Sequence, residues 1–300
     1  MSDTSVLFSH KTEEKYEKIM NALNSIKNRR FNEISGLSTG FTDLDKITAG
    51  LQAGDLIVFA SSAGMGKTAV ALNIAENVAV DQKKPVAIFS FGMSAEYAVI
   101  HIITSRLRLS TQKLRQGQLN PTDWKKITYL SQQIAKSPLF IEDNRTLNIM
   151  DICKQARQLA KDLKAKKTPL ALIVIDYLQL IYGSSKNYES REQEILEITQ
   201  TLKDLALELK VPIIVLSQIP DGVKGLDRGN YRHLLDSREF RIIEQYADLV
   251  AFVHREYYYN RKDPDIKKDA DIIIAKQKNG PTGQVALSYE SEFGRFYNKP

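Results

Sequence analysis

The sequence predicts an α/β protein whose mostly parallel, twisted sheet carries helices on both faces and ends in a C-terminal β-hairpin. Short apolar runs alternate with stretches of helical periodicity from residue 56 to residue 218, and this alternation is typical of parallel strands joined by crossover helices. The runs are apolar at nearly every position, as strands buried on both faces require. Near residue 280, turn-forming residues separate two further runs, which indicates the hairpin.

The composition is that of a globular chain with a large core. Of its 300 residues, 43% are hydrophobic and 26% are charged, so the chain is long enough for one large domain or two small ones. The net charge of +6 suits a polyanionic partner without identifying one. The single cysteine, Cys153, excludes an intramolecular disulfide and is expected to be a buried residue of a helix. No signal peptide, membrane-spanning run or His/Cys metal cluster is recognisable, so we expect a cytoplasmic protein without a membrane partner.

An amphipathic helix is predicted at residues 11–30, after a polar tail. Apolar residues recur there at helical spacing in one narrow stripe, namely Tyr16, Ile19, Met20, Leu23 and Ile26. Such a stripe fits a helix that packs on its own domain as well as one that docks on another subunit. We therefore divide the chain into a tail with a linker helix at 1–34 and a main domain at 35–300.

The stretch 56–78 combines a buried strand, a turn and a helix in the order of a phosphate-binding P-loop. Gly64 and Gly66 allow the backbone to wrap so that its N–H groups face phosphate oxygens, and the helix N-terminus adds a positive partial charge. Lys67 is expected to reach the β- and γ-phosphates, and the Thr68 hydroxyl to hold Mg²⁺. The residues that we expect to bind the nucleotide are Ser61, Ser62, Ala63, Gly64, Met65, Gly66, Lys67 and Thr68. Ser61 stands where the usual pattern begins with glycine.

Further strands and helices alternate along the chain. Strands are predicted at 85–91, 139–141, 170–176, 211–218 and 247–253. Helices are predicted at 43–47, 95–109, 121–135, 148–166 and 195–210, with Ser94 and Asn120 suited to cap two of them. The lone tryptophan, Trp124, is expected to be structural.

The strand at 170–176 ends in Asp176. An acid at that position is what a P-loop enzyme uses to hold the magnesium shell. Strand ends of this kind are also where open α/β sheets bind ligands. We therefore expect Thr68 and Asp176 to share one metal site.

The last third of the chain contains a predicted loop, a tyrosine cluster and the hairpin. Residues 219–239 are polar and basic, and a loop of that length is usually functional or disordered. The tyrosines at 257–259 suit stacking on bases, or packing at a strand end or in a loop, and we favour the packing. The runs 272–276 and 284–289 flank the turn residues 279–283, which predicts the hairpin.

Several of these stretches resemble the C-terminal ATPase domain of replicative DNA helicases of the DnaB type. The matching segments cover nearly residues 34–298, and the run from Ile175 to Leu180 is highly specific. The segments are 37–45, 66–69, 93–96, 117–119, 173–180, 191–195, 212–218, 243–245, 247–248, 274–281 and Gly283. The family commonly lacks the first P-loop glycine, as here. Its separate N-terminal helical domain has no counterpart in this sequence.

The resemblance implies a RecA-like domain that forms a six-membered ring with ATP and Mg²⁺ bound between subunits. Single-stranded DNA would pass central loops near 183–190 and 219–241, with the implied contacts Lys186, Lys224, Arg228, Arg238, Glu239 and Arg241. Gln218 would sense the γ-phosphate, while Lys276 and Lys278 would act on the neighbouring subunit's nucleotide. The helix at 11–30 resembles the linker helix that docks on the adjacent subunit, and other replisome proteins are implied partners.

Three departures from the family pattern involve four positions. Gly92 stands where a glutamate polarises the attacking water, and Lys278 replaces an arginine finger. In the DNA loop, Phe240 and Arg241 stand where the family has serine and glycine. These changes leave open the alternative of a catalytically weakened ATP-binding paralogue that regulates or docks on a helicase. A RecA-like recombinase is a third, less favoured hypothesis.

Overall fold

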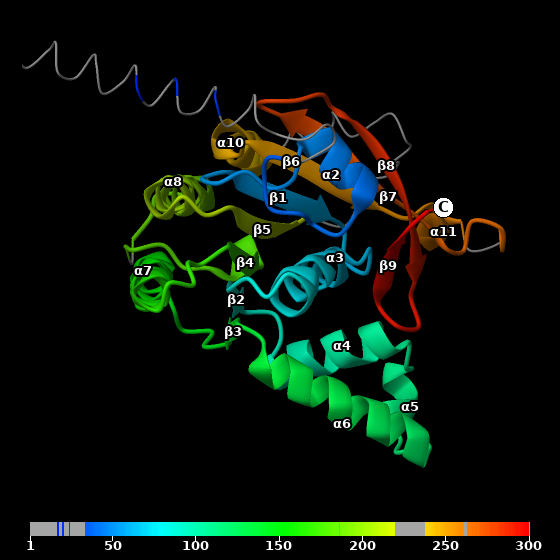
Figure 1. The fold of residues 1–300 in the computed structure, drawn as a ribbon. Helices are drawn as coiled ribbons and strands as arrows, with labels where there is room; N and C mark the ends of the chain where they lie inside the picture. Colours follow the sequence, from blue (N-terminus) through cyan, green and yellow to red (C-terminus); the bar gives the residue numbers. More distant parts are fainter. Residues whose placement is uncertain are drawn as a thin grey trace, which may run out of the picture. The chain divides into compact units, whose positions relative to one another are not determined.

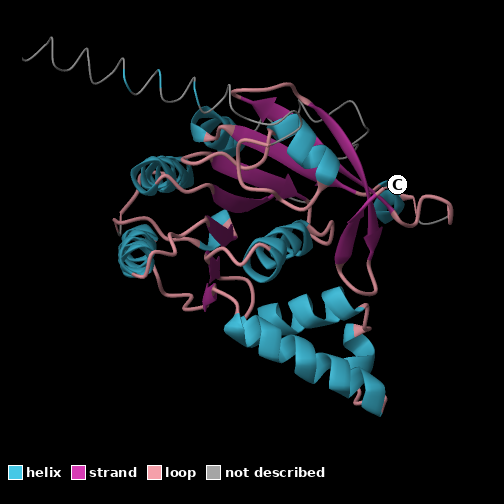
Figure 2. Cartoon of the chain, in the orientation of Figure 1, coloured by secondary structure: helices cyan, strands magenta, loops and turns pink. Residues whose placement is uncertain are grey.

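The computed structural model describes residues 17, 20, 24, 34–185, 187–219, 238–260 and 263–299. The chain divides into two units, residues 1–35 and residues 36–300. In the first unit, Glu17, Met20 and Asn24 are helical, and the rest of the helix predicted at 11–30 lies outside the described residues. The second unit is the α/β domain (Figures 1 and 2).

One sheet runs through the second unit, and its described strands lie in the order β3-β2-β4-β5-β1-β6-β7-β8-β9 (Figure 2). The strands are β1 (Leu56–Ser61), β2 (Val86–Ser90), β3 (Leu139–Glu142), β4 (Leu172–Asp176), β5 (Ile213–Gln218), β6 (Leu249–His254), β7 (Asp269–Gln277), β8 (Gly283–Glu290) and β9 (Arg295–Asn298). The strands from β3 to β6 in this order pair in parallel, and β7, β8 and β9 extend the sheet in antiparallel fashion. The predicted fold class and the hairpin, formed by β7 and β8, are therefore confirmed.

Helices cover both faces of the sheet. The longer ones are α2 (Thr42–Thr48), α3 (Lys67–Glu76), α4 (Ala95–Leu107), α6 (Pro121–Lys136), α7 (Ile149–Ala165), α8 (Arg191–Leu209) and α10 (Arg238–Tyr246). Shorter turns are η1 (Asn77–Asp81), α5 (Thr111–Arg115), η2 (Leu178–Leu180) and α11 (Glu256–Tyr259). Helices α7, α8 and α10 lie on one face, and α2, α3 and α4 lie on the other (Figure 1).

Strand β1 shows why the runs are apolar throughout. Ile57 and Phe59 pack into the core under α3, while Leu56, Val58 and Ala60 pack into the core under α8. Successive side chains of a strand point to opposite faces, so a central strand covered on both sides needs apolar residues at every position. Cys153 is fully buried in the second of these cores, as predicted.

The predicted helix starts are confirmed at two positions. The Ser94 side chain accepts a hydrogen bond from the Tyr97 backbone and begins α4. Asn120 caps α6 through a capping box with Asp123, and Pro121 occupies the first helical position. A side chain that accepts from an otherwise unpaired backbone N–H stabilises a helix end by about 1 kcal/mol.

Other predictions were wrong or incomplete. The predicted loop at 219–239 ends in the first turn of α10, because Phe240 and Ile243 are buried one helical turn apart. Residues 257–259 belong to the short helix α11 rather than to a strand end or a loop. Trp124 is 48% exposed on α6, so it does not serve the core. The short elements α5 and β9 were not predicted.

Within the described ranges, no helix combines the length and the apolar character that crossing a bilayer requires.

Candidate functional site

The polar ends of four neighbouring parallel strands meet at one edge of the sheet. Ser61 pairs with Gln218 at the ends of β1 and β5, and Ser90 pairs with Asp176 at the ends of β2 and β4. The carboxyl ends of parallel strands are where open α/β sheets bind ligands. This register therefore gathers the P-loop, the acid at 176 and the predicted sensor Gln218 on one side of the molecule.

The P-loop has the backbone that its glycines were expected to allow. Gly64 and Gly66 have φ of 77° and 102°, in the left-handed region that favours glycine. A Cβ at Gly66 would come within 3.0 Å of the Phe296 ring, so a side chain has no room there either. Helix α3 follows at Lys67 without a side-chain cap. Its first N–H groups are therefore available to an anion.

Lys67, Thr68 and Asp176 form the centre of the site. The Thr68 hydroxyl donates to Asp176 Oδ2 over 2.9 Å. Burial lowers the pKa of Lys67, and the charge of Asp176 opposes this. Burial raises the pKa of Asp176, against the hydrogen bond from Thr68 and the charge of Lys67. Each of the two charged side chains thus stabilises the charged form of the other. In addition, Lys67 attracts an anionic ligand, and Asp176 attracts a cation.

The residues present fit a phosphate and a magnesium ion. Lys67 is 9% exposed, and its Nζ lies 5.5 Å from the centre of the Tyr177 ring. A hydroxyl and a carboxylate at hydrogen-bond distance form the oxygen set that P-loop enzymes use around Mg²⁺. Among the described residues, no cluster of three or more His, Cys, Asp and Glu side chains competes for a metal.

Gly92 lies in the exposed turn after β2, beside this centre. Its backbone N–H donates to the Asp176 carbonyl over 3.3 Å. A Cβ added there would meet only the Tyr177 ring, at an ordinary 3.8 Å. The backbone at residue 92 therefore has room for a larger side chain. A carboxylate is missing there because the residue is glycine, and not because neighbouring atoms exclude one. Glu96 is exposed in the first turn of α4.

Two residues that lie beside the P-loop, Arg255 and Tyr289, were not predicted from the sequence. Arg255 is 7% exposed, its Nη1 donates to the Gly64 carbonyl over 3.4 Å, and its guanidinium lies 4.3 Å from the Tyr289 ring centre. Burial lowers the pKa of Arg255, and its Nε has no hydrogen-bond partner in the described part of the chain. These residues follow β6 and end β8, far from the motif in sequence, so no local pattern reveals them.

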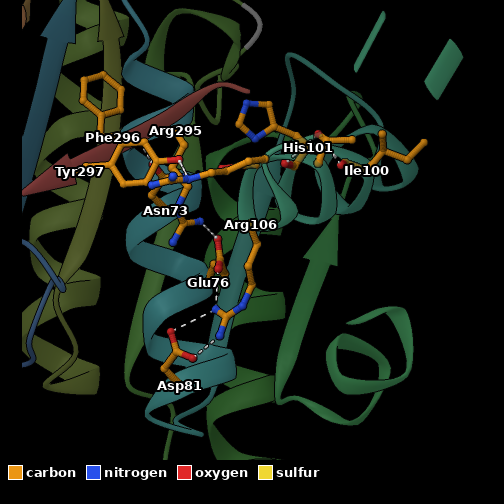
Figure 3. A network of polar contacts seen from close by, with 12 residues as sticks. Asn73, Glu76, Asp81, Ile100, His101, Arg106, Arg295, Phe296 and Tyr297 are labelled. Carbon is orange, nitrogen blue, oxygen red and sulfur yellow. Dashed lines mark hydrogen bonds and ion pairs between the residues drawn. The ribbon is translucent and has the colours of Figure 1, made fainter. Parts of the chain in front are cut away.

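Polar side chains anchor the C-terminal part of the P-loop helix α3 to neighbouring elements (Figure 3). Glu76 is fully buried and accepts from Arg106 of α4 over 2.6 Å and from Arg295 of β9 over 2.8 Å. Arg106 also pairs with Asp81 over 2.5 Å. One helix turn earlier, Asn73 Oδ1 accepts from the Phe296 backbone over 2.9 Å. The helix that carries Lys67 is thus tied to α4 and to β9.

Lys276 and Lys278 lie toward the other edge of the sheet. The Lys278 backbone N–H donates to the Asp248 carbonyl. The backbone N–H of Asp248 in turn donates to the Leu56 carbonyl at the start of β1. The P-loop follows the end of β1, roughly 17 Å further along the strand. The Lys276 ammonium donates to the Glu244 carbonyl. Neither lysine therefore belongs to the P-loop site of its own chain.

The predicted DNA contacts are only partly described. Lys186, Lys224 and Arg228 lie outside the described residues. Arg238 and Arg241 are exposed on α10, and Glu239 is half-buried on the same helix. Helix α10 packs on the sheet through Phe240, whose ring stacks on Phe252 at 5.5 Å. The departures at 240 and 241 thus belong to a packed helix and not to a loop.

The chain is similar to a family model, to curated proteins and to solved structures. The family model "DnaB-like helicase C terminal domain" matches residues 36–298. The replicative DNA helicase DnaB of Geobacillus stearothermophilus is 44% identical over 270 residues, which cover 90% of this chain and 58% of the relative. The solved ATPase domain of G40P gives a TM-score of 0.85 at 31% identity and covers 95% of this chain and 98% of that one.

A second solved structure, of a DnaB-like replicative helicase and its interactions with primase, gives a TM-score of 0.83 at 29% identity and covers 94% of this chain and 68% of that one. The chain spans less than two thirds of the length of the curated helicases that it matches first.

Proposed function

Because this chain belongs to the DnaB-like helicase C-terminal domain family, we propose that it is the ATP-driven motor of a replicative DNA helicase. In this proposal, it hydrolyses ATP in a homo-hexameric ring and moves along single-stranded DNA. The relatives' names favour this motor over the alternative of a regulatory ATP-binding paralogue. The observation that carries the proposal is the buried group of Lys67, Thr68 and Asp176 at the carboxyl edge of the sheet.

The site residues have distinct roles in the proposal. The P-loop backbone at 61–66 and the N-terminus of α3 bind the nucleotide's phosphates, and Lys67 neutralises the charge between the β- and γ-phosphates. Thr68 and Asp176 hold Mg²⁺, which supplies further stabilisation of the charge on the phosphates. Gln218 lies at the end of β5, where the loss of the γ-phosphate alters its contacts. Burial strengthens each of these electrostatic interactions.

The positions of Lys276 and Lys278 support a ring. They lie away from the P-loop of their own chain, so they are placed to reach a nucleotide only across an interface with a second copy. An interface that joins the P-loop edge of one copy to the lysine edge of the next is heterologous, and such an interface forms a ring when the rotation from copy to copy closes. Lys278 keeps the positive charge of a finger without the planar fork of arginine.

DNA and partner contacts complete the proposal. Basic side chains in the segments near 183–190 and 219–241, including Lys186, Lys224 and Arg228 together with Arg238 and Arg241 of α10, would bind the DNA backbone independently of sequence. In this proposal, the helix predicted at 11–30 docks on the adjacent subunit of the ring. The exposed aromatic side chains Trp124 and Tyr129 of α6 offer one apolar surface for it. A primase contact is proposed from the likeness to the helicase studied with primase.

The test is steady-state ATP hydrolysis with and without single-stranded DNA, compared with Lys67→Ala. We expect DNA to raise turnover, and the substitution to abolish it, because the phosphates lose their buried counter-charge. Lys84→Ala is the matched control, since Lys84 is an exposed lysine after the same helix. Turnover no higher than that of Lys67→Ala, together with measurable nucleotide binding, would reject the motor and favour the regulatory paralogue.

A further inference from the structure

The side-chain amide of Gln179 joins two parts of the chain that lie 21 residues apart, on either side of the undescribed segment 220–237. Gln179 lies in η2, directly after the strand that ends in Asp176. Its Oε1 accepts from the Gln218 backbone N–H over 3.0 Å. Its Nε2 donates to Glu239 Oε1 over 2.7 Å and lies 3.0 Å from Ser217 Oγ. The amide therefore connects the end of β5 to the first turn of α10.

The partners determine which way this amide points. A backbone N–H can only donate, and an ionised carboxylate can only accept. Oε1 must therefore face Gln218, and Nε2 must face Glu239. No other uncharged side chain of that length offers an acceptor and a donor on one carbon, so the link is specific to glutamine.

The backbone of Gln179 leads to a third segment. Its carbonyl accepts from Arg191 Nη2 over 3.1 Å. Arg191 also pairs with Glu194, and Glu194 Oε1 accepts from the Gly183 backbone N–H over 2.8 Å. Gly183 begins the first of the two segments that we propose to face DNA. Gln179 thus contacts Glu239 directly and is connected to Gly183 through Arg191 and Glu194.

We propose that Gln179 is a positioning residue that couples the state of the nucleotide site to the DNA-facing segments. The inference rests on the proposed function, because it presumes that Gln218 responds to the nucleotide and that these segments bind DNA. A shift of Gln218 changes the hydrogen bond to Gln179 Oε1. The amide then changes its bond to Glu239, since both bonds belong to one rigid planar group. The start of α10 follows, and any movement of the Gln179 backbone reaches the loop from Gly183 through Arg191 and Glu194.

The test measures coupling rather than activity. We would measure the affinity of the chain for a fluorescent single-stranded oligonucleotide in ADP and in a non-hydrolysable ATP analogue. Wild type should show a nucleotide-dependent ratio of Kd values, typically about 5-fold to 150-fold for coupled sites. Gln179→Leu and Gln179→Glu should bring that ratio toward one while the affinity for nucleotide is retained. Gln158→Leu is the matched control, because Gln158 also donates to a carboxylate, that of Asp162, but on the exposed face of one helix.

A double variant that exchanges the glutamine at 179 and the glutamate at 239 distinguishes a loss of coupling from misfolding. Gln179→Glu places a carboxylate against Glu239 and removes the donor. The double variant with Glu239→Gln restores one donor and one acceptor to this pair, so it should recover much of the ratio. A double variant no better than Gln179→Glu, with both proteins folded, would overturn the proposed link.

Hydrogen exchange gives a readout that does not depend on DNA binding. In Gln179→Leu, amide exchange should accelerate in 238–246, relative to wild type and to Gln158→Leu. Exchange in 181–185 should change less, because the substitution keeps the backbone carbonyl that accepts from Arg191. Unchanged exchange in 238–246 overturns the inference whatever the DNA result. If wild type shows no nucleotide-dependent DNA binding, the proposed function fails, and the exchange result alone then decides whether Gln179 holds the segments together. If wild type is coupled and the variants remain so, only the inference fails.

Discussion

At the position of Gly92, the site has room for a carboxylate that it lacks. A Cβ there would touch only the Tyr177 ring, at 3.8 Å, and φ lies outside the left-handed region. We expect Gly92→Glu to raise ATP turnover by roughly 10²-fold or more, because a positioned carboxylate orients the attacking water. Steady-state hydrolysis measures this. Gln112→Glu, which adds the same charge on exposed α5, should have no effect. Unchanged turnover in Gly92→Glu would mean that another defect limits the chemistry.

Asp55 makes the stability of the domain depend on pH. Burial, followed by the charge of Asp248, raises its pKa from 3.8 to about 6, against the opposing charges of Lys203 and Lys278. The folded state therefore binds this proton more tightly than the unfolded state. Protonated Asp55 adds to the free energy of unfolding, and this contribution is lost as the pH rises from 3.8 to about 6.

We expect Asp55→Asn to flatten this slope and to increase the free energy of unfolding above pH 6. Urea unfolding across this pH range measures both effects. Asp204→Asn, an exposed substitution on α8, should leave the slope as in wild type. A slope that is unchanged in Asp55→Asn would contradict the assignment.

Only part of the site could be predicted from local sequence. Lys67, Thr68 and Asp176 were predicted because strand, turn and helix chemistry is encoded within a few residues. Arg255 and Gln179 were not predicted in their present roles, because their partners lie far away in the sequence. The contact of Arg255 with Gly64 joins residues 191 positions apart.

At the scale of elements, the P-loop helix depends on two neighbours. Glu76 is a buried carboxylate that pairs with Arg106 and Arg295 (Figure 3). Glu76→Gln leaves two arginines facing a neutral group, and breaking a buried pair typically costs about 3–5 kcal/mol. We expect a loss of that size in denaturant unfolding. Glu208→Gln is the control, because its pair with Arg157 is exposed and should cost about 1 kcal/mol or less. Equal losses in the two variants would contradict this account.

Elements were predicted well where their own residues specify them. The central strands and the capped helices α4 and α6 begin and end within a few residues of the expected positions. Helix α10 was missed because its charged residues suggested a loop, although Phe240 and Ile243 have helical spacing. Strand β9 is four residues long and exists through its pairing with β8, which no short stretch of sequence encodes.

At the scale of the whole molecule, the two proposed parts of the ATP site, the P-loop and Lys278, lie toward opposite ends of the parallel strands. Chains with Lys67→Ala lack the phosphate lysine, and chains with Lys278→Ala lack the lysine offered to a neighbour. We expect each variant alone to hydrolyse ATP poorly. A mixture should regain activity, because the intact P-loop of a Lys278→Ala chain can face the intact Lys278 of a Lys67→Ala chain. Steady-state hydrolysis against mixing ratio measures this.

The control mixture combines Lys67→Ala with Asp176→Ala. Both substitutions damage the same half of the site, so no interface in the mixture is complete and activity should stay low. Recovery in the control, or none in the first mixture, would show that Lys278 does not act across an interface.

Strand β9 also has a consequence for how the protein is made. Phe296 covers Gly66, and Arg295 pairs with Glu76 on the P-loop helix, yet β9 leaves the ribosome after every other described strand. Because chains emerge N-terminus first, the P-loop is synthesised long before the residues that cover it. The nascent chain therefore has an uncovered P-loop until β9 has been synthesised.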